Sequence, residues 1–333
     1  MRINKFIFDV EKTPYLIAEI GINHEGSVKR AFELVKSAKL CGAHAVKFQH
    51  FKASDLYLPK NKNFNQLKRF ELKEESLVKL KNYSKKIKID FICTAFSTTG
   101  INLLNSINVD AFKIASMDNN NHILINSCLK YKKPIIISTG MMGLSDLKKF
   151  CKIYKKYLNR FIILHCISEY PAKNNNCNLL AIDFLNKFFY KKSIIGYSDH
   201  TVGLDVSKIA ITQGARIIEK HFTHDNKIKK YDHIHSMNNL QLKELADFSK
   251  QYKKILGSHS FLKNRTDKKN KKYFRRGIYA KNNLLSKERL SRSNILFVRP
   301  SNKEDIDIDP KLFKKKIKNK LKAWRQIGKK NLY

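Results

Sequence analysis

Short apolar runs rich in Ile, Val and Phe recur eight times between residues 15 and 256, and a stretch with helical spacing follows each of them. The runs are Tyr15–Ile20, Ala45–Phe48, Ile89–Thr94, Ala111–Ser116, Pro134–Thr139, Phe161–Cys166, Ser193–Tyr197 and Arg216–His221. The stretches that follow are Ser27–Leu40, Glu74–Lys85, a short helix after Ser97, His122–Tyr131, Leu144–Tyr157, Asn178–Phe189, Val202–Gln213 and Asn239–Leu256. Strands that alternate with helices favour a parallel sheet, and eight such units within about 250 residues predict a closed (β/α)₈ TIM barrel.

A doubly wound sheet is the competing α/β fold, and it requires a Gly-rich phosphate-binding turn after an early strand. The segment Gly21–Gly26 lacks the GxGxxG spacing of such a turn. The sequence therefore favours the barrel.

The chain continues past the eighth unit into sequence that is more basic and less apolar. We expect a barrel domain over 1–257, a linker over 258–272 and a small separate domain over 273–333. In the small domain, Gly277–Ala280 and Ile295–Val298 are predicted strands, and Leu312–Trp324 has the spacing of a helix.

The composition points to a cytoplasmic protein. No apolar run reaches the roughly 18 residues of a membrane span, and the first residues lack the apolar core of a signal peptide. None of the six cysteines forms a CxxC pair, so we expect them to be reduced and structural.

A net charge of +39 arises from 67 Lys and Arg residues against 28 Asp and Glu residues. Such a field attracts polyanions, and a non-catalytic barrel that binds nucleic acid is one interpretation. The basic tail lacks the interleaved aromatic residues that stack on bases. Since lysine is abundant in every segment, we expect the excess to be compositional, and we do not expect a nucleic acid partner.

Polar residues stand at the end of nearly every predicted strand, where barrel enzymes carry their catalytic groups. In strand order they are Glu19, Lys47 with Gln49, Thr94, Lys113 with Ser116 and Asp118, Ser138, Ser168 with Tyr170, Ser198 with His200, and Glu219 with His221. Single Ser and Thr residues at strand ends often only cap the next helix. Taken together, however, the residues predict a polar site at one end of the barrel.

Two lysines within apolar runs point to an anionic ligand. Lys47 and Lys113 follow buried positions on the second and fourth strands, where an unpaired ammonium group is costly. Hydroxyl groups on neighbouring strands would add neutral donors, which is how proteins hold phosphate or carboxylate groups.

A histidine pair points to a divalent metal ion. His200 follows the seventh strand and His221 ends the eighth, so the two imidazoles should be adjacent. Imidazole is a common ligand of borderline divalent ions. In a closed barrel the first strand adjoins the eighth, so Glu19 can approach this pair.

These residues stand in segments with a family resemblance. The segments Ile17–Gly26, Val46–Gln49, Lys113–Ser116, Ile137–Met141, Gly196–Thr201 and Glu219–Thr223 resemble the N-acetylneuraminate (sialic acid) synthase family, which includes the legionaminate and pseudaminate synthases. The similarity extends over about residues 14–260 and, more weakly, to about 310.

The resemblance implies a barrel followed by an antifreeze-like (SAF) domain, in a domain-exchanged homodimer whose small domain covers the partner's active site. It implies a transferase that condenses phosphoenolpyruvate with N-acetylmannosamine, or a related amino-sugar aldehyde, to a nine-carbon 2-keto acid and phosphate. By motif, phosphoenolpyruvate would contact Lys47, Thr94, Lys113, Ser116, Ser138, Ser168, Ser198 and Arg299, the last reaching across the dimer. The sugar would contact Glu19, Gln49, Asp118, Tyr170 and Asp232, and His200 with His221 would bind Mn²⁺ or Mg²⁺.

The implied catalytic residues are Glu19, Lys47, Lys113, His200 and His221. The metal would polarise the aldehyde, the lysines would hold phosphoenolpyruvate against it, and Glu19 would handle a proton. A diacetamido-trideoxy-hexose is the alternative acceptor, and a 3-deoxy-keto-acid synthase acting on a sugar phosphate is a weaker alternative. The chain departs from the family pattern at Lys230-Tyr231, before Asp232, and at Ser301-Asn302-Lys303, after Arg299-Pro300.

Overall fold

The computed structural model describes residues 1–8, 13–190, 192–258, 265–301 and 306–333. They fall into two units, Met1–Ile255 and Leu256–Tyr333, and each unit is described by itself. The expected linker and the segment Ser301-Asn302-Lys303 lie partly outside the described residues.

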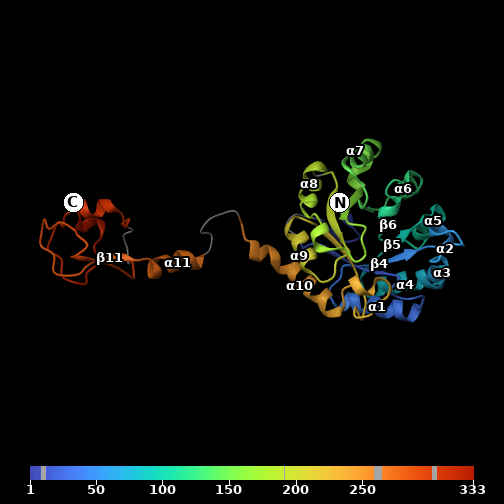
Figure 1. Cartoon of the computed structure of the whole chain (residues 1–333), viewed down its shortest axis with the longest axis horizontal. Helices are drawn as coiled ribbons and strands as arrows, with labels where there is room; N and C mark the ends of the chain where they lie inside the picture. The colour runs from blue at the N-terminus through green and yellow to red at the C-terminus, as the bar shows by residue number, and fades with distance from the viewer. Residues whose placement is uncertain (9–12, 191, 259–264, 302–305) are drawn as a thin grey trace. The chain divides into compact units, whose positions relative to one another are not determined.

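Eight parallel strands close into a barrel in the first unit, as the sequence predicts (Figure 1). They are β3 (Tyr15–Gly21), β4 (Ala45–His50), β5 (Asp90–Ala95), β6 (Ala111–Ile114), β7 (Ile135–Ser138), β8 (Phe161–Cys166), β9 (Ile194–Asp199) and β10 (Ile217–His221). Each strand pairs with the next along the chain, and β10 pairs with β3 to complete the ring.

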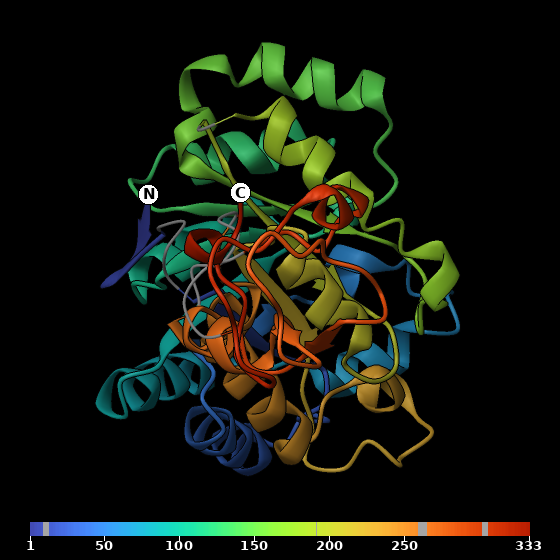
Figure 2. The same ribbon diagram turned by 90° about the vertical axis from the view of Figure 1, so that its left-hand side faces the viewer.

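Helices surround the strands on the outside of the barrel (Figures 1 and 2). They are α1 (Val28–Leu40), α4 (Glu74–Lys86), α5 (Thr98–Ser106), α6 (His122–Leu129), α7 (Leu144–Ile153), α8 (Leu180–Phe188), α9 (Asp205–Thr212) and α10 (Asn239–Leu256). Side-chain oxygens cap several of their starts: Ser27 accepts from Arg30 N, Ser97 from Gly100 N and Asn121 from Leu124 N. The helix expected to reach Tyr157 ends at Ile153 and gives way to the 3₁₀ helix η2 (Lys155–Arg160).

Side chains on each strand alternate between the helices and the barrel interior, as the period of two requires. On β3, Leu16, Ala18 and Ile20 pack under the helices, whereas Tyr15 and Ile17 point into the barrel. The interior cluster contains Ala45, Ile92, Ala111, Ile136, Ile162, Leu164 and Ile217, which stand in the first half or middle of their strands. The next inward positions along these strands are polar, so the apolar core ends where the site begins.

A short antiparallel hairpin of β1 (Arg2–Ile3) and β2 (Phe6–Ile7) was not predicted from the sequence. Ile3 is fully buried in the interior cluster, and Phe6 and Phe8 pack against it. Because that cluster includes residues at the strand starts, the hairpin covers the amino-terminal end of the barrel.

The connection between β4 and α4 contains two helices that the sequence analysis missed, α2 (Ala53–Leu56) and α3 (Phe64–Phe70). Short 3₁₀ helices follow three other strands: η1 (Ser116–Asp118), η3 (Asn174–Asn176) and η4 (Tyr231–His235). These connections supply the residues that surround the polar end of the barrel.

The second unit adds one helix to the expected elements and corrects one expectation. Part of the expected linker is helix α11 (Arg265–Phe274). The predicted helix over Leu312–Trp324 was wrong, because only η5 (Pro310–Lys314) is helical there. Its apolar residues instead join a small core through isolated bridges, Ile317 to Leu332 and Leu321 to Leu284.

The two strands predicted for this unit are present as β11 (Gly277–Ala280) and β12 (Ile295–Val298), and η6 (Lys329–Asn331) lies near the carboxyl end. Assignment of the second unit as an antifreeze-like (SAF) domain stays a prediction. Among the described residues of the whole chain, no helix is long and apolar enough to span a membrane.

Candidate functional site

A cavity of about 380 Å³ opens at the carboxyl ends of the barrel strands. Twelve residues proposed from the sequence line it: Glu19, Lys47, Gln49, Thr94, Lys113, Ser116, Ser138, Tyr170, Ser198, His200, His221 and Asp232. Strand register explains the convergence, since Glu19 stands opposite both Lys47 and His221 on neighbouring strands. Lys113 likewise stands opposite Thr94.

Buried lysines and glutamates form a charge network on the cavity floor. Lys47 Nζ lies 2.8 Å from Glu19 Oε2 and 3.7 Å from Glu219 Oε1. Lys113 Nζ lies 3.8 Å from the same Glu219 oxygen and donates to Ser138 Oγ at 2.8 Å. The two ammonium groups therefore balance two carboxylates, and an anion entering the cavity meets donors that are already oriented.

Burial and these pairings shift the network's pKa values in different directions. Burial raises the pKa of Glu19, although Lys47 opposes the rise. Burial alone would also raise the pKa of Glu219, but Lys113 and Lys47 hold it below its usual value. Burial lowers the pKa of Lys113, whereas Glu19 and Glu219 overcome burial and raise that of Lys47. Glu219 is thus the ionised partner of both lysines, and Glu19 is the carboxylate better suited to gain a proton.

Hydroxyl groups surround Gly140, which follows β7. A methyl group added at Gly140 would come within 2.3 Å of Ser168 Oγ and 2.6 Å of Ser116 Oγ. Asn119 fixes this segment by donating to the carbonyl oxygens of Gly140 and Ser138. The absence of a side chain at Gly140 allows the two hydroxyls to stand together.

Three histidines gather on the β10 side of the cavity. The ring centroids of His200 and His221 are 5.7 Å apart, which confirms that the two expected residues are adjacent. The His235 ring lies 4.7 Å from that of His221 and 6.2 Å from that of His200. Ligand atoms of His221, Asp232 and His235 all lie within 4.8 Å of one another.

The environment keeps these imidazoles neutral at physiological pH. Burial lowers the pKa of His200 to about 4 and that of His235 to about 3, and burial with the neighbouring histidines lowers that of His221. Burial, followed by the charge of Glu19, raises the pKa of Asp232 to about 7. Neutral imidazole is the form that binds a metal, so the donors suit a divalent ion.

Gly21 shows how tightly the carboxylates and His221 converge. A methyl group added there would lie 3.2 Å from Glu19 Oε1, 3.3 Å from His221 Cε1 and 3.4 Å from Asp232 Oδ2. The residue also has a φ of +52°, which favours glycine. The backbone therefore leaves a small space that these groups share.

Three residues proposed from the sequence do not line the cavity. Ser168 lies at its edge beside Gly140. Asp118 lies in η1, where its carboxylate accepts from Asn121 Nδ2 at 3.1 Å. Arg299 belongs to the second unit, where its guanidinium lies over the Phe274 ring. The substrate contacts of Asp118 and Arg299 stay predictions.

Sequence reasoning also missed residues that the structure places at the site. Glu219 was noted at a strand end but received no role, although its inward position two residues before His221 gave the signal. His235 was missed because it lies at the end of the short 3₁₀ helix η4, beyond any strand end. An apolar wall, formed by Ile22, Leu56, Tyr57, Leu67 and Phe96, lines the same cavity, and three of its members come from the missed α2–α3 connection.

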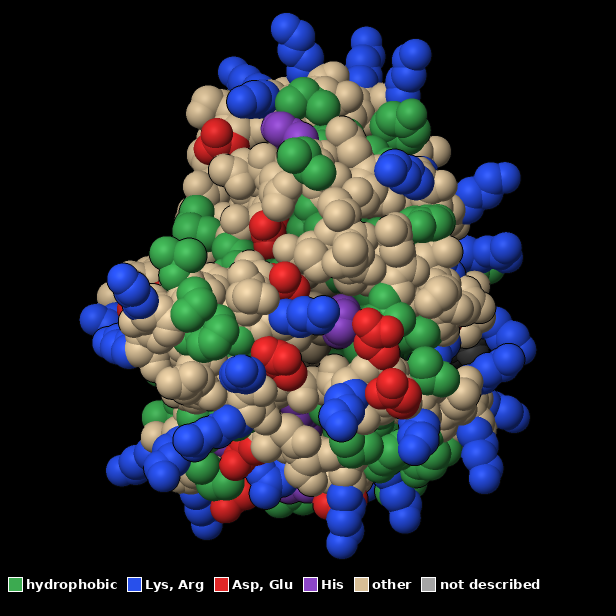
Figure 3. All heavy atoms as spheres, turned by 90° about the vertical axis from the view of Figure 1, so that its right-hand side faces the viewer, with side chains coloured by type: hydrophobic (Ala, Val, Ile, Leu, Met, Phe, Trp, Pro, Cys, Tyr) green, Lys and Arg blue, Asp and Glu red, His purple; other side chains and the backbone are tan. Residues whose placement is uncertain are grey.

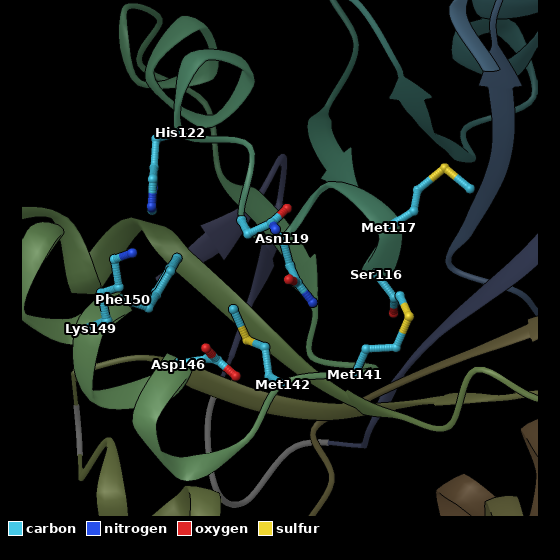
Figure 4. Close-up of a pocket in the computed structure, with 10 residues that line it drawn as sticks. Ser116, Met117, Asn119, His122, Met141, Met142, Asp146, Lys149 and Phe150 are labelled. Carbon is cyan, nitrogen blue, oxygen red and sulfur yellow. The ribbon is translucent and has the colours of Figure 1, made fainter. Parts of the chain in front are cut away.

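A second cavity of about 490 Å³ adjoins the first and shares Ser116 and Met117 with it. His122 and Asn119 lie across it from Met142 (Figure 4). Of the residues proposed from the sequence, only Ser116 lines this cavity, so the candidate site is the first one.

Comparisons with known proteins identify the family and agree with the fold. A profile of the NeuB family matches residues 34–261. An uncharacterized protein of Methanocaldococcus jannaschii is 38% identical over 306 residues, which are 92% of this chain and 90% of that protein. The N,N'-diacetyllegionaminic acid synthase of Legionella pneumophila is 34% identical over 307 residues, 86% of each chain.

A solved structure has the same fold. The N-acetylneuraminic acid synthetase of Leptospira borgpetersenii superposes with a TM-score of 0.73 at 31% identity, covering 78% of this chain and 90% of that one. Since the family profile spans more than half of the chain and the two relatives span most of it, the chain belongs to the NeuB family.

Proposed function

We propose that this enzyme condenses phosphoenolpyruvate with an amino-sugar aldehyde to give a nine-carbon 2-keto acid and phosphate. The observation that carries the proposal is the cavity at the mouth of a NeuB-family barrel, which is lined by two buried lysines, four serine or threonine residues and the histidines His200 and His221. Membership of the family and the names of the relatives support the reaction class.

Lys47 and Lys113 are the proposed ligands of phosphoenolpyruvate. Both are buried and held by short contacts, so they can neutralise phosphate and carboxylate groups without first shedding water. Thr94, Ser116, Ser138 and Ser198 add hydroxyl donors around them, with Ser168 at the edge. These residues would hold the C3 carbon of phosphoenolpyruvate against the aldehyde, which raises the effective concentration of the two reactants.

His200 and His221 are the proposed ligands of a divalent ion, Mn²⁺ or Mg²⁺. When bound, the ion supplies Lewis-acid polarisation of the sugar carbonyl. The neutral imidazoles and the unpartnered, buried His221 Nδ1 fit such an ion. His200 Nδ1 bonds the Ile167 carbonyl oxygen at 2.9 Å, which leaves Nε2 for a ligand.

Glu19 is the proposed proton acceptor. Attack of C3 on the aldehyde forms the new C–C bond, converts the aldehyde oxygen to a hydroxyl group by uptake of one proton, and leaves a cationic centre at C2, to which water adds. Glu19 takes the first proton that this water loses. The C2–O bond to phosphate then breaks, and the new C2 hydroxyl becomes the keto group as its remaining proton passes to the departing phosphate. The raised pKa of Glu19 makes its carboxylate a stronger base for that proton, and Gln49 Nε2 orients the group by donating to Oε1 at 2.9 Å.

The acceptor sugar is proposed to carry acetamido groups. The apolar wall offers a surface for their methyl groups within the same cavity. A diacetamido-trideoxy-hexose, which exposes further apolar carbon, is the second candidate, and the Legionella relative's name supports it. N-acetylmannosamine is the first candidate, supported by the name of the Leptospira protein.

The test measures phosphate release from phosphoenolpyruvate by the purified full-length protein with Mn²⁺, offering each acceptor in turn. We expect release that depends on one sugar, with a nine-carbon 2-keto acid found by mass spectrometry. Phosphoenolpyruvate labelled with ¹⁸O at the bridging position should yield labelled phosphate, because the C2–O bond breaks. Absence of release with every amino sugar, despite a folded protein, would contradict the proposal.

His221→Ala is the matched loss-of-function variant, and His224→Ala is its control. His224 is exposed and contacts Ser37, away from the cavity residues. We expect the first change to reduce turnover at least 100-fold and the second to leave it unchanged. Full turnover by His221→Ala without metal would remove the histidines from the mechanism.

We also propose that two copies of the chain form a homodimer in which Arg299 of each small unit completes the site of the other copy. The support is the position of Arg299 in a unit separate from the barrel, where it is exposed at the end of β12.

A further inference from the structure

His235 is a buried histidine that the proposed reaction does not yet use. Only 2% of its surface is exposed, and neither ring nitrogen has a hydrogen-bond partner among the described residues. Burying an imidazole without partners for its polar atoms costs free energy, so native structures usually satisfy them. Its two unpartnered nitrogens therefore call for a ligand.

The loop that carries His235 is firmly anchored to the barrel. Met237 N donates to His221 O at 2.7 Å, and Thr223 N donates to Met237 O at 2.9 Å, which continues β10 into the loop. Asn23 Nδ2 donates to Ser236 Oγ at 2.9 Å from the connection after β3. His235 is therefore held beside His221 by backbone bonds.

A third anchor comes from the neighbouring histidine in the same loop. His233 contacts Thr223 Oγ1 through one ring nitrogen and Glu25 Oε1 through the other, at 2.7 and 3.1 Å. Its nitrogens are thus satisfied, whereas those of His235 are not. The contrast within one loop distinguishes a histidine that fixes structure from one that is available to a ligand.

The positions of the surrounding donors define what that ligand is. His235 Nε2 lies 4.0 Å from Asp232 Oδ1, and His221 Nδ1 lies 3.5 Å from Asp232 Oδ2. These three residues offer ligand atoms within 4.8 Å of one another, and the ring centroid of His200 lies 6.2 Å from that of His235. An ion with bonds of about 2.0–2.2 Å bridges donors up to roughly 4 Å apart, and the separations of His221 and His235 from Asp232, 3.5 and 4.0 Å, are of that size.

We propose that His235 is a third imidazole ligand of the divalent ion, together with His200 and His221. This inference rests on the proposed function, because it concerns the ion assigned to that site. A third imidazole favours borderline ions such as Mn²⁺ and Co²⁺ over Mg²⁺, which prefers oxygen ligands and retains its water. The enzyme therefore discriminates between Mn²⁺ and Mg²⁺ through His235.

The test measures metal binding by the full-length protein after treatment with a chelator. Co²⁺ is the spectroscopic probe, since its visible ligand-field bands report the number and type of ligands, and Mn²⁺ binding is followed by electron paramagnetic resonance. We expect His235→Ala to weaken Co²⁺ and Mn²⁺ binding at least tenfold and to change the Co²⁺ bands. Mg²⁺ binding should change less, so the preference for Mn²⁺ narrows.

Two further variants separate ligation from folding. His224→Ala, in the neighbouring segment, should bind Co²⁺ as the unmodified protein does. His235→Cys should retain Co²⁺ binding and add a near-ultraviolet thiolate-to-Co²⁺ charge-transfer band, which a purely structural residue would not produce. Wild-type affinity and spectra in both His235→Ala and His235→Cys, with binding lost in His221→Ala, would overturn the assignment.

Failure of this inference and failure of the proposed function give different results. Sugar-dependent phosphate release by the unmodified protein, with unchanged Co²⁺ binding by His235→Ala, would leave the synthase standing and remove the third ligand. Loss of Co²⁺ binding in His235→Ala, without phosphate release for any sugar, would support the ligand and contradict the synthase.

Discussion

At the scale of single residues, a missing side chain matters as much as the charged groups of the site. Gly140 lets the hydroxyls of Ser116 and Ser168 stand together at the cavity edge. A Gly140→Ala substitution pushes them apart, because the added carbon would come within 2.6 Å of both oxygens. We expect the KM for phosphoenolpyruvate to rise about tenfold, which corresponds to about 1.4 kcal/mol, while the fold is kept.

Gly143→Ala is the matched control for this change. A methyl group at Gly143 would meet nothing closer than Asp146 Oδ2 at 3.6 Å. Steady-state kinetics of the two variants should therefore differ in KM for phosphoenolpyruvate alone. An unchanged KM in Gly140→Ala would show that the two hydroxyls do not hold the substrate.

His44 makes the stability of the barrel depend on pH. Burial, followed by the charge of Lys39, lowers its pKa to about 4, and its Nδ1 accepts from Leu16 N at 3.0 Å. In the unfolded chain the pKa of a histidine is about 6.5. Between pH 6.5 and about pH 4, His44 therefore binds a proton more readily in the unfolded chain than in the folded one. Stability from His44 is therefore present above pH 6.5 and is lost as the pH falls toward 4.

His44→Asn keeps an acceptor for Leu16 N and removes the titration. Lowering the pH from 7 to 4.5 should reduce the free energy of unfolding of His44→Asn by about 2 kcal/mol less than that of the unmodified protein. Urea unfolding at each pH measures this difference. The same pH dependence in both proteins would mean that His44 is not the responsible group.

At the scale of elements, the amino-terminal hairpin closes one end of the barrel. Ile3 is fully buried in the interior cluster, whereas Ile7 in the other strand of the hairpin is 52% exposed. We expect Ile3→Ala to lower the free energy of unfolding by about 3 kcal/mol, because it leaves a cavity against the barrel interior. Ile7→Ala should change it by less than about 0.5 kcal/mol, and equal losses in urea unfolding would contradict a closing role for the hairpin.

The eight strands were predictable because each alternates a buried outer face with an inner face that changes from apolar to polar. That alternation also located Lys47, Lys113 and His221 at the site. It missed His235, since a loop carries no period, and its position depends on bonds to Asn23 and His221 far away in sequence.

The wrong helix in the second unit has a similar physical cause. Leu312, Ile317 and Leu321 repeat at intervals that a helix and an irregular chain can both bury. Isolated bridges to Leu284 and Leu332 decide between them, and such distant partners are not visible in local spacing. Asp118 lies just past a strand end in a 3₁₀ turn and does not line the cavity, so its contact with the sugar stays a prediction.

At the scale of the whole molecule, the proposed homodimer can be tested by mixing two inactive variants. Arg299→Ala damages the small unit and His221→Ala damages the barrel, so neither homodimer should turn over. If Arg299 of one copy completes the site of the other, mixed dimers contain one intact site, and random exchange restores about a quarter of the activity. Activity measured after exchange should remain at background if Arg299 acts on its own barrel.

Charge is the other property of the whole molecule. Lys and Arg side chains project around the face shown in Figure 3, in keeping with the net charge of +39. Screening over about 10 Å at moderate salt limits how far these exposed charges act. Binding to nucleic acid should accordingly be independent of its sequence and should weaken steeply as salt is added.

The buried charged groups differ from those at the surface, because each buried lysine has a carboxylate partner. Lys47 and Lys113 face Glu19 and Glu219, and Lys220 contacts Asp199 at 2.9 Å. The positive and negative groups on the cavity floor thus balance one another, independently of the charge at the surface. An engineer can recode the outer shell of this barrel toward acidic residues, for solubility or crystallisation, and leave the electrostatics of the chemistry as they are.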